Sequence, residues 1–538
     1  MATPRPARLR APLWLSIVLL LPFAAILWLQ LTDGTGDVGM NNVFTYMAVM
    51  LIASIYGVWF LVASGQTLRC KLTTFGVLGV AVGAVVFLGD LRGWTGSMTP
   101  VVRWIWESQE DRSITSVAAA DDELAPTGGL DLIAQGPTDF PGYLGVGRDA
   151  RVGGVDLSTD WSSTPPELLW RVPSGLGWSG FAIVNSVAIT HEEFDGQSHV
   201  VARDAMTGAE HWRYSHDSSF EHVLGGSGPR ATPAIDEGYV YAQDAHGLLL
   251  CIDGADGSLV WQDDLLARFG VTPEIEAATI QYGRSGSPLI HGDLVIIPAG
   301  GDPDSKRAGI VAFDKRTGEV RWEGPPRAIS HASPTVATLL GVEQFLVMNE
   351  GTVSGHSLAD GALLWEHSWP GSTPADANNS QPVVVGDGQV LVSKGYGSGS
   401  SLLSLKRTQT GDWSVTALWA QRRSLRTKLT TAVVRDGHAF GLSDGMLECI
   451  SLSDGKRVWK EGRFGHGQLL LVGEHLLILS EEGELLLVEA SAKGEGELLG
   501  RFPVLEGKTW NTFAMMGELV VLRNGQEAAA VRLPRAEE

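Results

Sequence analysis

The chain has 538 residues, too many for one small core, and its 61 acidic against 40 basic residues give a formal net charge of -21. Because such a charge repels phosphates and no basic patch reverses it, nucleic acid is excluded as a partner. A hydrophobic content of 44% and a mean hydropathy of +0.07 are high for a fully soluble protein, so part of the chain is expected to lie in lipid.

Three apolar runs open the chain, at residues 13–31, 43–63 and 72–88. The first has 19 residues, enough for a helix to cross a hydrocarbon core of about 30 Å. A cleavable signal peptide is the alternative for this run, since three Arg residues precede it, but no small-x-small cleavage site comes before Asp33. Residues 1–90 are therefore predicted to be a membrane anchor with three transmembrane helices.

Basic residues flanking the runs set the expected orientation. Arg residues precede the first run, and Arg69 and Lys71 separate the second from the third, whereas the first loop carries only Asp33 and Asp37. The positive-inside rule then places the N-terminus in the cytoplasm and everything after Asp90 outside the inner membrane, in the periplasm of a Gram-negative cell. The runs contain no Asp, Glu, Lys, Arg or His, so they are expected to anchor rather than transport.

Residues 91–160 are predicted to be a tether and lead-in of mixed character. Trp94, Trp104 and Trp106 occupy positions typical of a membrane interface. The polar and acidic segment that follows is expected to be partly disordered over 108–128.

A short motif recurs along the rest of the chain, and its clearest copy is GIVAFDKRTGEVRW at residues 309–322. Alternating apolar residues such as Ile310 and Ala312 predict a half-buried strand. Asp314 can accept hydrogen bonds from N–H groups two or three residues ahead, and Gly318 can adopt the positive φ that closes a turn. Trp322 lies on a second strand, so the motif predicts a β-hairpin with a large aromatic on its outgoing arm.

Copies of this hairpin return at intervals between 40 residues, from Trp419 to Trp459, and 61 residues, from Trp261 to Trp322. Such a period, built from strands alone, predicts a propeller. The residues that define the copies are Asp204, Gly208, Trp212, Asp253, Gly257, Trp261, Asp314, Gly318, Trp322, Gly361, Trp365, Trp419, Gly455 and Trp459.

The repeat resembles the tryptophan-docking repeat of the pyrroloquinoline-quinone-type (PQQ-like) β-propellers, which include quinoprotein alcohol dehydrogenases and the outer-membrane barrel-assembly propeller lipoprotein. The resemblance runs over residues 165–534 and implies the fold, while the activity stays open because the superfamily includes enzymes and non-enzymes. Residues 140–170 resemble the lead-in of such propellers and are expected to cross the propeller face as an extended strand.

Eight innermost strands are predicted, at residues 181–190, 232–241, 288–298, 334–348, 382–392, 431–442, 468–479 and 513–522, against seven outgoing arms. The missing arm is assigned to residues 168–172, LLWRV. An N-terminal strand that completes the last blade closes the ring and removes two exposed sheet edges. The predicted fold is all-β, an eight-bladed β-propeller over residues 161–538 after three transmembrane helices, with seven blades as the alternative.

Residues just before each innermost strand lie at one rim of the central channel in a propeller. Here they are often polar and include several cations, which predicts a central funnel for an anionic or carboxylated ligand. Alternatively, the polar side chains only satisfy backbone groups where strands begin. The candidate ligand-binding residues are Trp178, Arg230, Arg284, His331, Gln381, Lys428, His466, Trp510 and Asn511.

The glycine-rich insertion EHVLGGSGPR, residues 221–230, also precedes an innermost strand. It is interpreted either as a rim loop that delivers Glu221 or His222 to the funnel as acid or base, or as a plain turn between blades.

A quinoprotein dehydrogenase of the superfamily would use a vicinal disulfide and a Trp on the two faces of the quinone, a calcium ion and an Asp base. The three cysteines, Cys70, Cys251 and Cys449, are not adjacent, and no C-x-x-C-H haem motif occurs. The signatures G-x-S-x-G and H-E-x-x-H are absent from the sequence as well. No catalytic residue, cofactor or metal site is therefore predicted, with PQQ and calcium as the alternative.

The sequence thus predicts a membrane-anchored periplasmic PQQ-like propeller. Its predicted role is that of a non-catalytic binding or scaffold protein that meets a protein or peptide partner with one rim. The alternative is a quinoprotein oxidoreductase that holds pyrroloquinoline quinone in the funnel and passes electrons to membrane quinone.

Overall fold

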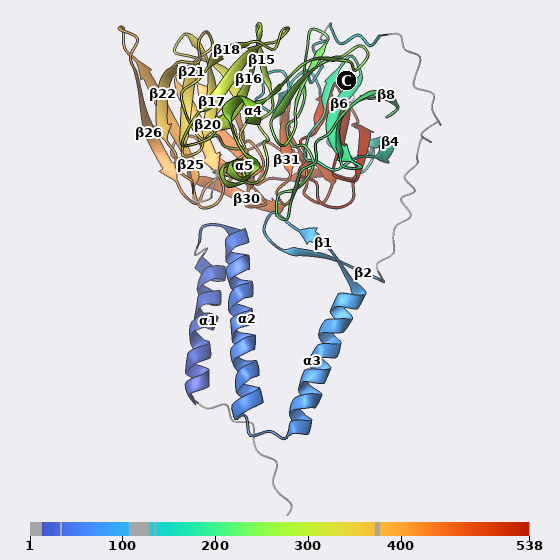
Figure 1. Cartoon of the computed structure of the whole chain (residues 1–538), viewed down its shortest axis with the longest axis vertical. Helices are drawn as coiled ribbons and strands as arrows, with labels where there is room; N and C mark the ends of the chain where they lie inside the picture. The colour runs from blue at the N-terminus through green and yellow to red at the C-terminus, as the bar shows by residue number, and fades with distance from the viewer. Residues whose placement is uncertain (1–12, 33–34, 107–128, 134–135, 372–376, 537–538) are drawn as a thin grey trace, which may run out of the picture. The chain divides into compact units, whose positions relative to one another are not determined.

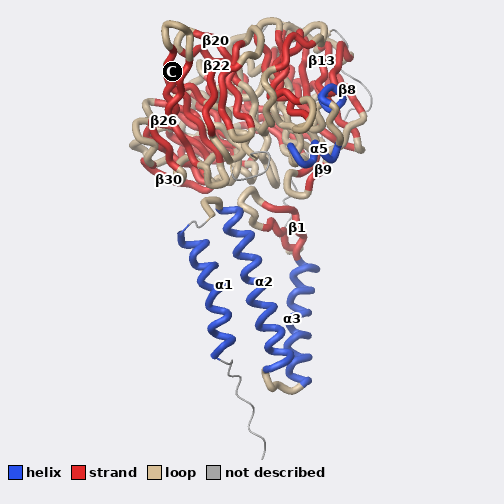
Figure 2. The backbone as a smooth tube through the Cα atoms, turned by 60° about the vertical axis from the view of Figure 1, so that its left-hand side comes forward, coloured by secondary structure: helices blue, strands red, loops and turns tan. Residues whose placement is uncertain are grey.

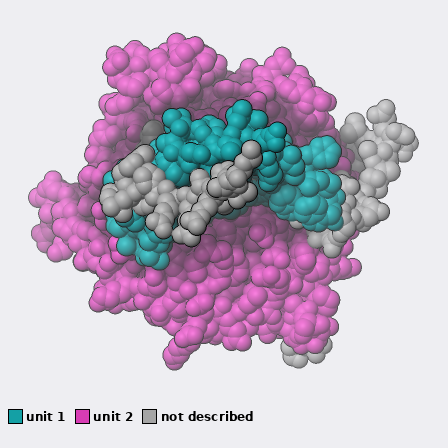
Figure 3. All heavy atoms as spheres, turned by 90° about the horizontal axis from the view of Figure 1, so that it is seen from below, with its two compact units in different colours: residues 1–112 teal, residues 113–538 magenta. Residues whose placement is uncertain are grey.

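The computed structural model describes residues 13–32, 35–106, 129–133, 136–371 and 377–536 (Figure 1). The chain divides into two compact units, residues 1–112 and 113–538, which Figure 3 colours separately. The disorder expected over residues 108–128 lies outside the described residues.

Unit 1 contains three apolar helices, α1 (Leu13–Thr32), α2 (Val38–Ala63) and α3 (Leu68–Leu88), drawn in blue in Figure 2. Among the described residues, α2 and α3 are long and apolar enough to cross a membrane, and α1 contributes a shorter apolar stretch, Val18–Thr32. Two spans are therefore supported by length and composition, and the third stays a prediction.

A β-hairpin follows α3, where a tether was expected. It consists of β1 (Gly89–Trp94) and β2 (Pro100–Trp104), which pair antiparallel. Asn42 of α2 donates its Nδ2 hydrogen to the carbonyl O of Ser97 at 2.8 Å, which ties the hairpin turn to the helix. Strands of six and five residues carry too few apolar positions to stand out in the sequence.

In unit 2, the described residues form eight blades of four or five strands and one separate two-stranded sheet, and in six of the blades four strands follow one another in chain order. Blade 1 is β5–β8 (Ala182–Val184, Val187–Phe194, Gln197–Asp204, Glu210–His216). Blade 2 is β11–β14 (Ala234–Asp236, Tyr239–Gln243, Leu248–Asp253, Leu259–Asp264), and α4 (Leu265–Phe269) and α5 (Pro273–Thr279) follow it. Blade 3 is β15–β18 (Leu289–His291, Leu294–Gly301, Arg307–Asp314, Val320–Glu323).

Blades 4 to 6 repeat this order. Blade 4 is β19–β22 (Thr335–Leu339, Val342–Asn349, Thr352–Ser357, Leu363–Ser368). Blade 5 is β23–β26 (Val383–Gly386, Gln389–Lys394, Gly399–Arg407, Trp413–Gln421). Blade 6 is β27–β30 (Val433–Arg435, His438–Ser443, Met446–Ser451, Arg457–Arg463).

Blades 7 and 8 each take a strand from the N-terminal side of the propeller. Blade 7 is β31–β34 (Gln468–Val472, His475–Leu479, Glu484–Glu489, Leu498–Pro503), to which β3 (Arg151–Val152) adds in parallel. Blade 8 is β35–β37 (Ala514–Met516, Leu519–Arg523, Glu527–Arg532), completed by β4 (Glu167–Pro173) antiparallel to β37. Eight blades are confirmed, and the arm predicted at residues 168–172 is β4.

Each segment predicted as one innermost strand is two strands joined by a tight turn, which corrects the prediction. In blade 1, Asn185 and Ser186 form the turn between β5 and β6 and adopt positive φ angles of 49° and 64°. Positive φ at both turn residues matches the twist of the strands in a hairpin. Apolar residues continue through both arms, so the hydrophobic pattern does not mark the turn.

The strand that carries the motif is buried on both faces, not half-buried as predicted. In β17 the side chains of Ile310, Val311, Ala312 and Phe313 are all at most 1% exposed. Neighbouring blades cover the two faces of the sheet, so apolar residues follow one another without alternation.

The motif's indole docks on the next blade, as Trp212 illustrates. Its Nε1 donates to the carbonyl O of Gly254 at 2.9 Å. Its ring packs so closely on Gly257 that a Cβ at that position would come within 2.8 Å of the ring. The φ of Gly257 is 78°, so both the close contact with the ring and the positive φ of the backbone favour glycine at this position. The same bond joins Trp170, Trp261, Trp322, Trp419 and Trp459 to the carbonyls of Ala205, Lys315, Leu358, Leu452 and Ser491.

Two blades depart from this pattern. The Nε1 of Trp365 donates within its own blade, to Oε1 of Gln344 at 2.6 Å. Trp413, from the longer hairpin of blade 5, packs against the group of buried apolar side chains that includes Trp365. Blade 7 lacks the motif's Trp, and Trp161 of the lead-in lies over Gly500 of β34. The lead-in therefore supplies an indole that blade 7 does not encode.

Candidate functional site

The two ends of the propeller carry different connections. In each four-stranded meander, the turns after the first and third strands lie at one end, and the remaining connections lie at the other. The predicted site residues fall at this second end, in the segments that lead into the first strand of each blade. We call these segments together the connection rim: residues 174–181, 217–233, 280–288, 324–334, 377–382, 422–432, 464–467 and 504–513.

The lead-in spans the ring from blade 1 to blade 7. Phe140 bridges to Ile183 of β5, and β3 pairs with β31. Between these points the Arg148 guanidinium donates to the carbonyl O of Ser287 at 3.1 Å and of Pro288 at 2.7 Å. Burial lowers the pKa of Arg148 to about 10.

Gln381 holds the lead-in. Its Nε2 donates to the carbonyl O of Arg148 at 3.2 Å, and its backbone N–H donates to Oγ1 of Thr431 at 3.1 Å. The side chain is 1% exposed. Gln381 thus connects blade 5 to the segment that crosses the channel.

Hydroxyl groups link neighbouring blades around the channel. The N–H of Gly180 donates to Oγ1 of Thr232 at 3.1 Å, and the N–H of Thr232 donates to Oγ of Ser287 at 3.0 Å. The N–H of Ser287 donates in turn to Oγ of Ser333 at 2.9 Å. These hydroxyls accept hydrogen bonds from backbone N–H groups where the innermost strands begin, which is the role given to such side chains by the alternative interpretation of the sequence.

Two predicted indoles meet at the connection rim. The ring centroids of Trp178 and Trp510 are 5.0 Å apart and the rings are tilted by 43°. Nζ of Lys508 lies over both, 4.3 Å from the Trp510 centroid and 5.2 Å from that of Trp178. Oε1 of Glu481 accepts from Nε1 of Trp510 at 2.8 Å. Sequence reasoning missed Lys508 and Glu481, although Lys508 precedes the Trp by only two residues.

Arg230 holds a small hairpin made of β9 (Glu221–His222) and β10 (Gly226–Ser227). Its Nη2 donates to the carbonyl O of Gly226 at 2.7 Å, and its guanidinium carbon lies 4.1 Å from the centroid of the Phe220 ring. Burial lowers the pKa of Arg230 to about 9. The group is charged at neutral pH and is engaged by its own chain.

His331 is 5% exposed and is neutral at pH 7. Burial is the main cause that lowers its pKa to about 4, and the positive charge of Arg230 adds to the effect. The imidazole lies 5.8 Å from the ring of Tyr282, measured between centroids.

Arg284 is 2% exposed and pairs with Glu276 of α5. Its Nε donates to Oε1 of that carboxylate at 2.6 Å and its Nη2 donates to Oε2 at 3.0 Å. Such a bidentate pair is strong and well oriented. The insertion between blades 2 and 3 therefore supplies the partner of this cation.

Lys428 and His466 lie close together on the connection rim. Nζ of Lys428 is 4.7 Å from the centroid of the Tyr396 ring. The backbone N–H of His466 donates to Oε2 of Glu481 at 3.0 Å. Burial and the charge of Lys428 hold the pKa of His466 well below its usual range, so its ring is neutral.

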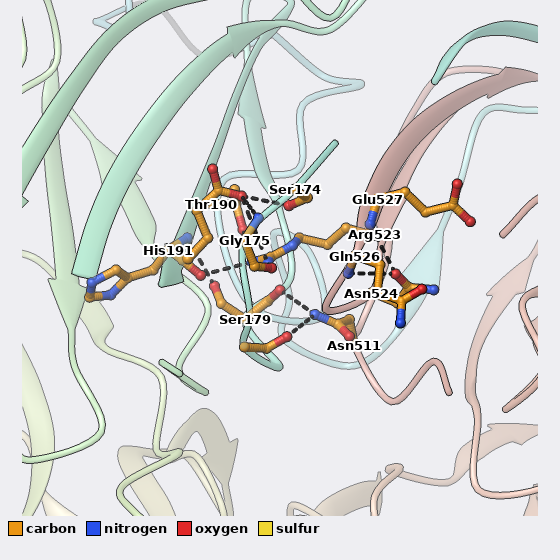
Figure 4. Close-up of polar contacts among 12 residues, drawn as sticks. Ser174, Gly175, Ser179, Thr190, His191, Asn511, Arg523, Asn524, Gln526 and Glu527 are labelled. Carbon is orange, nitrogen blue, oxygen red and sulfur yellow. Dashed lines mark hydrogen bonds and ion pairs between the residues drawn. The ribbon is translucent and has the colours of Figure 1, made fainter. Parts of the chain in front are cut away.

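Asn511 belongs to the junction between blades 8 and 1 (Figure 4). Its Nδ2 donates to the carbonyl O of Gly177 at 3.0 Å and of Ser179 at 2.9 Å. Beside it, Nη1 of Arg523 donates to Oγ1 of Thr190 at 3.1 Å. Asn511 therefore takes part in closing the ring.

A family model described as "Outer membrane protein assembly factor BamB" matches residues 169–461, more than half of the chain. The assembly factor BamB of Alkalilimnicola ehrlichii is 27% identical over 219 residues, which cover 37% of this chain and 50% of that protein. The dehydrogenase subunit of a quinone alcohol dehydrogenase from Gluconacetobacter polyoxogenes is 29% identical over 219 residues, 38% of this chain and 28% of that protein.

Among solved structures, a europium-containing methanol dehydrogenase superposes with a TM-score of 0.53 at 11% identity, covering 74% of this chain and 99% of that one. This likeness shows the fold alone. The chain spans half or less of the length of the two curated relatives above. The matches therefore point to an assembly factor and to quinoprotein dehydrogenases without preferring either.

Proposed function

Because the chain belongs to the PQQ-like β-propeller family of the outer membrane protein assembly factor BamB, we propose that it docks a protein or peptide partner on its connection rim as a non-catalytic scaffold. The observation that supports this proposal is the arrangement of charged and apolar side chains on the rim. The cations predicted to face a ligand are engaged inside the chain, whereas apolar side chains remain exposed.

Arg284 and Arg230 illustrate the engaged cations, since one pairs with Glu276 and the other donates to backbone carbonyls. Exposed apolar side chains of the rim are Val223 at 93%, Leu224 at 45% and Leu176 at 45%. An exposed apolar group offers no donor to a small anion, whereas it can be buried against the surface of another protein. The rim therefore suits a protein surface.

The proposed location follows from the helices of unit 1. We propose that they hold the chain in the inner membrane with the N-terminus in the cytoplasm and the propeller in the periplasm. Arg69 and Lys71 support this orientation, because basic loops stay on the cytoplasmic side. Alkaline phosphatase fused after residue 538 is expected to be active, and an inactive fusion would overturn the orientation.

The second candidate is a quinoprotein oxidoreductase, favoured by the 29% identity to a quinone alcohol dehydrogenase subunit. The groups around the two indoles do not fit a calcium-bound quinone. Nζ of Lys508 lies over both Trp178 and Trp510, so a quinone stacked on that side of either indole would have to displace it. The carboxylate beside them, Glu481, already accepts from Trp510 and from His466.

Photo-crosslinking in intact cells tests the docking proposal. Benzoylphenylalanine replaces Arg423, an exposed residue of the connection rim, and in a matched variant it replaces Val458, 44% exposed on β30. Adducts with another protein are expected from position 423 and not from position 458. In parallel, the purified full-length chain is titrated with pyrroloquinoline quinone and calcium. Alcohol-dependent dye reduction together with failure to crosslink would favour the second candidate.

A further inference from the structure

The hairpin of β9 and β10 displays its apolar tip to solvent. Val223 at the tip is 93% exposed, and Leu224 beside it is 45% exposed. The hairpin arises from the insertion that the sequence left open between a rim loop carrying an acid or base and a plain turn.

Side chains from outside the tip hold it in place. Nε1 of Trp178 donates to the carbonyl O of Gly225 at 2.6 Å. Arg230 donates from Nη2 to the same oxygen at 3.2 Å and to the carbonyl O of Gly226 at 2.7 Å. Its other terminal nitrogen, Nη1, donates to the carbonyl O of Gly228. An indole and a guanidinium thus fix three backbone carbonyls of the hairpin, those of Gly225, Gly226 and Gly228.

His222 completes the support. Its Nδ1 accepts from the backbone N–H of Leu224 at 3.2 Å and of Gly225 at 3.0 Å. Its ring packs against that of Tyr282 in a T-shaped arrangement with centroids 4.9 Å apart. Burial and the charge of Arg230 lower the pKa of His222, which keeps Nδ1 available as an acceptor. His222 therefore braces the loop and is not placed as an acid or base.

This support carries a desolvation cost. Removing a guanidinium from water is unfavourable, and Arg230 is only 8% exposed. The bonds it makes order a loop that packs no apolar core of its own. A rigid tip loses little conformational entropy when it enters a partner, whereas a flexible one would lose much more.

The charge beside the tip indicates the kind of partner. Glu221 of β9 is exposed, and the chain carries a net charge of -21. The Arg230 guanidinium nearby is turned to backbone carbonyls. An anionic lipid headgroup would be repelled by Glu221, whereas a basic side chain on a protein would be attracted to it.

We propose that Val223 and Leu224 insert into an apolar pocket of a protein partner, and that a Lys or Arg at the border of this pocket meets Glu221. The inference rests on the proposed docking function and assigns it a contact point and a partner chemistry. The tip lies in the apolar centre of the contact, and Glu221 contributes to its polar border.

Benzoylphenylalanine at position 223 of the full-length chain in its native membrane tests the proposal. The expected product is one protein adduct whose crosslinked peptide contains apolar residues and a Lys or Arg. The Glu221→Lys substitution in the same chain is expected to lower the adduct yield about two- to fivefold, the range of an exposed ion pair. Glu221→Gln should give an intermediate yield.

The control position is Val458, 44% exposed on β30, which should give no such adduct. Lipid adducts alone, no adduct, or an equal yield in the Glu221→Lys chain would each overturn the inference. Crosslinking from position 423 without crosslinking from 223 would overturn this inference and leave the docking function standing. Position 223 is almost fully exposed, so its replacement is not expected to impair folding.

Discussion

Nη2 of Arg523 lies 3.8 Å from Oε2 of Glu192, and this buried ion pair joins the last blade to the first. Arg523 is on β36 and is 0% exposed, and Glu192 is on β6 and is 1% exposed. The same guanidinium donates to the carbonyl O of His191 at 2.8 Å and to that of Gly175 (Figure 4). Ring closure therefore depends on a polar network as well as on the strand β4.

Replacing Arg523 by Met is expected to lower the free energy of unfolding by about 3–5 kcal/mol, because Glu192 would keep a buried charge with one partner fewer. Arg203 remains 3.5 Å from Glu192 and limits the loss. The measurement is urea denaturation of the full-length chain followed by Trp fluorescence. Arg532→Ala, which removes an exposed pair with Glu167 in the same blade, should change the value by less than about 1 kcal/mol.

The docking of Trp261 on Gly318 can be separated from backbone strain. Gly318 and Gly341 both have a φ of 73°, but a Cβ would come within 2.7 Å of the Trp261 ring at Gly318 and would meet nothing within 4 Å at Gly341. Both Ala substitutions should cost about 1–2 kcal/mol for the left-handed backbone. Gly318→Ala should cost about 1–3 kcal/mol more because of the clash. Equal thermal shifts would contradict the docking contact.

Buried histidines make stability depend on pH. Burial lowers the pKa of His331 and of His356 to about 4 in the folded chain, from an ordinary value of 6.5. The unfolded chain therefore binds more protons than the folded chain between pH 6.5 and pH 4. Stability is expected to be highest above pH 6.5 and to fall as the pH drops through this window.

His356→Phe tests this dependence. Phe retains a ring to stack on Phe345, which lies 5.0 Å from His356 between centroids, and it cannot titrate. The urea midpoint of the variant should fall less steeply between pH 6.5 and pH 4 than that of the unchanged chain. An identical slope in both chains would show that His356 does not titrate in this window.

Trp161 contributes to blade 7 from a distant part of the chain. It is 5% exposed and packs over Gly500 of β34. Trp161→Ala should destabilise the propeller by about 3–5 kcal/mol, as for other large buried aromatics. Hydrogen exchange should speed up first in β34. Leu498→Ala on the same strand removes a side chain that is 44% exposed and should cost no more than about 0.5 kcal/mol.

The repeat made the fold predictable. Asp204 and Gly208 form a turn, and Trp212 supplies an indole that docks on the next blade. The motif therefore predicts both a hairpin and the packing of one blade on the next. The same logic located β4 as the strand that closes the ring. The exception at Trp365 was hidden because its Nε1 donates to Gln344 of its own blade, a partner outside the motif.

The candidate site was only partly predictable. Trp178 and Trp510 each precede an innermost strand, so the sequence placed both at the same rim. Their rings are indeed in contact. It did not reveal that Arg284 pairs with Glu276, because that carboxylate comes from a helix inserted between two blades. It also gave no sign that Val223 is exposed, since one aliphatic residue in a loop carries no pattern.

Accessibility of the two ends of the propeller tests the docking account most directly. Ser219 lies on the connection rim and Ser453 lies in a turn at the opposite end, and both are exposed. Each is replaced by Cys, and the rate of labelling by a membrane-impermeant maleimide is compared between native membranes and purified chain. The account predicts slower labelling in native membranes at position 219 and no difference at position 453. Equal rates at 219 in both preparations, or protection at 453 alone, would contradict it.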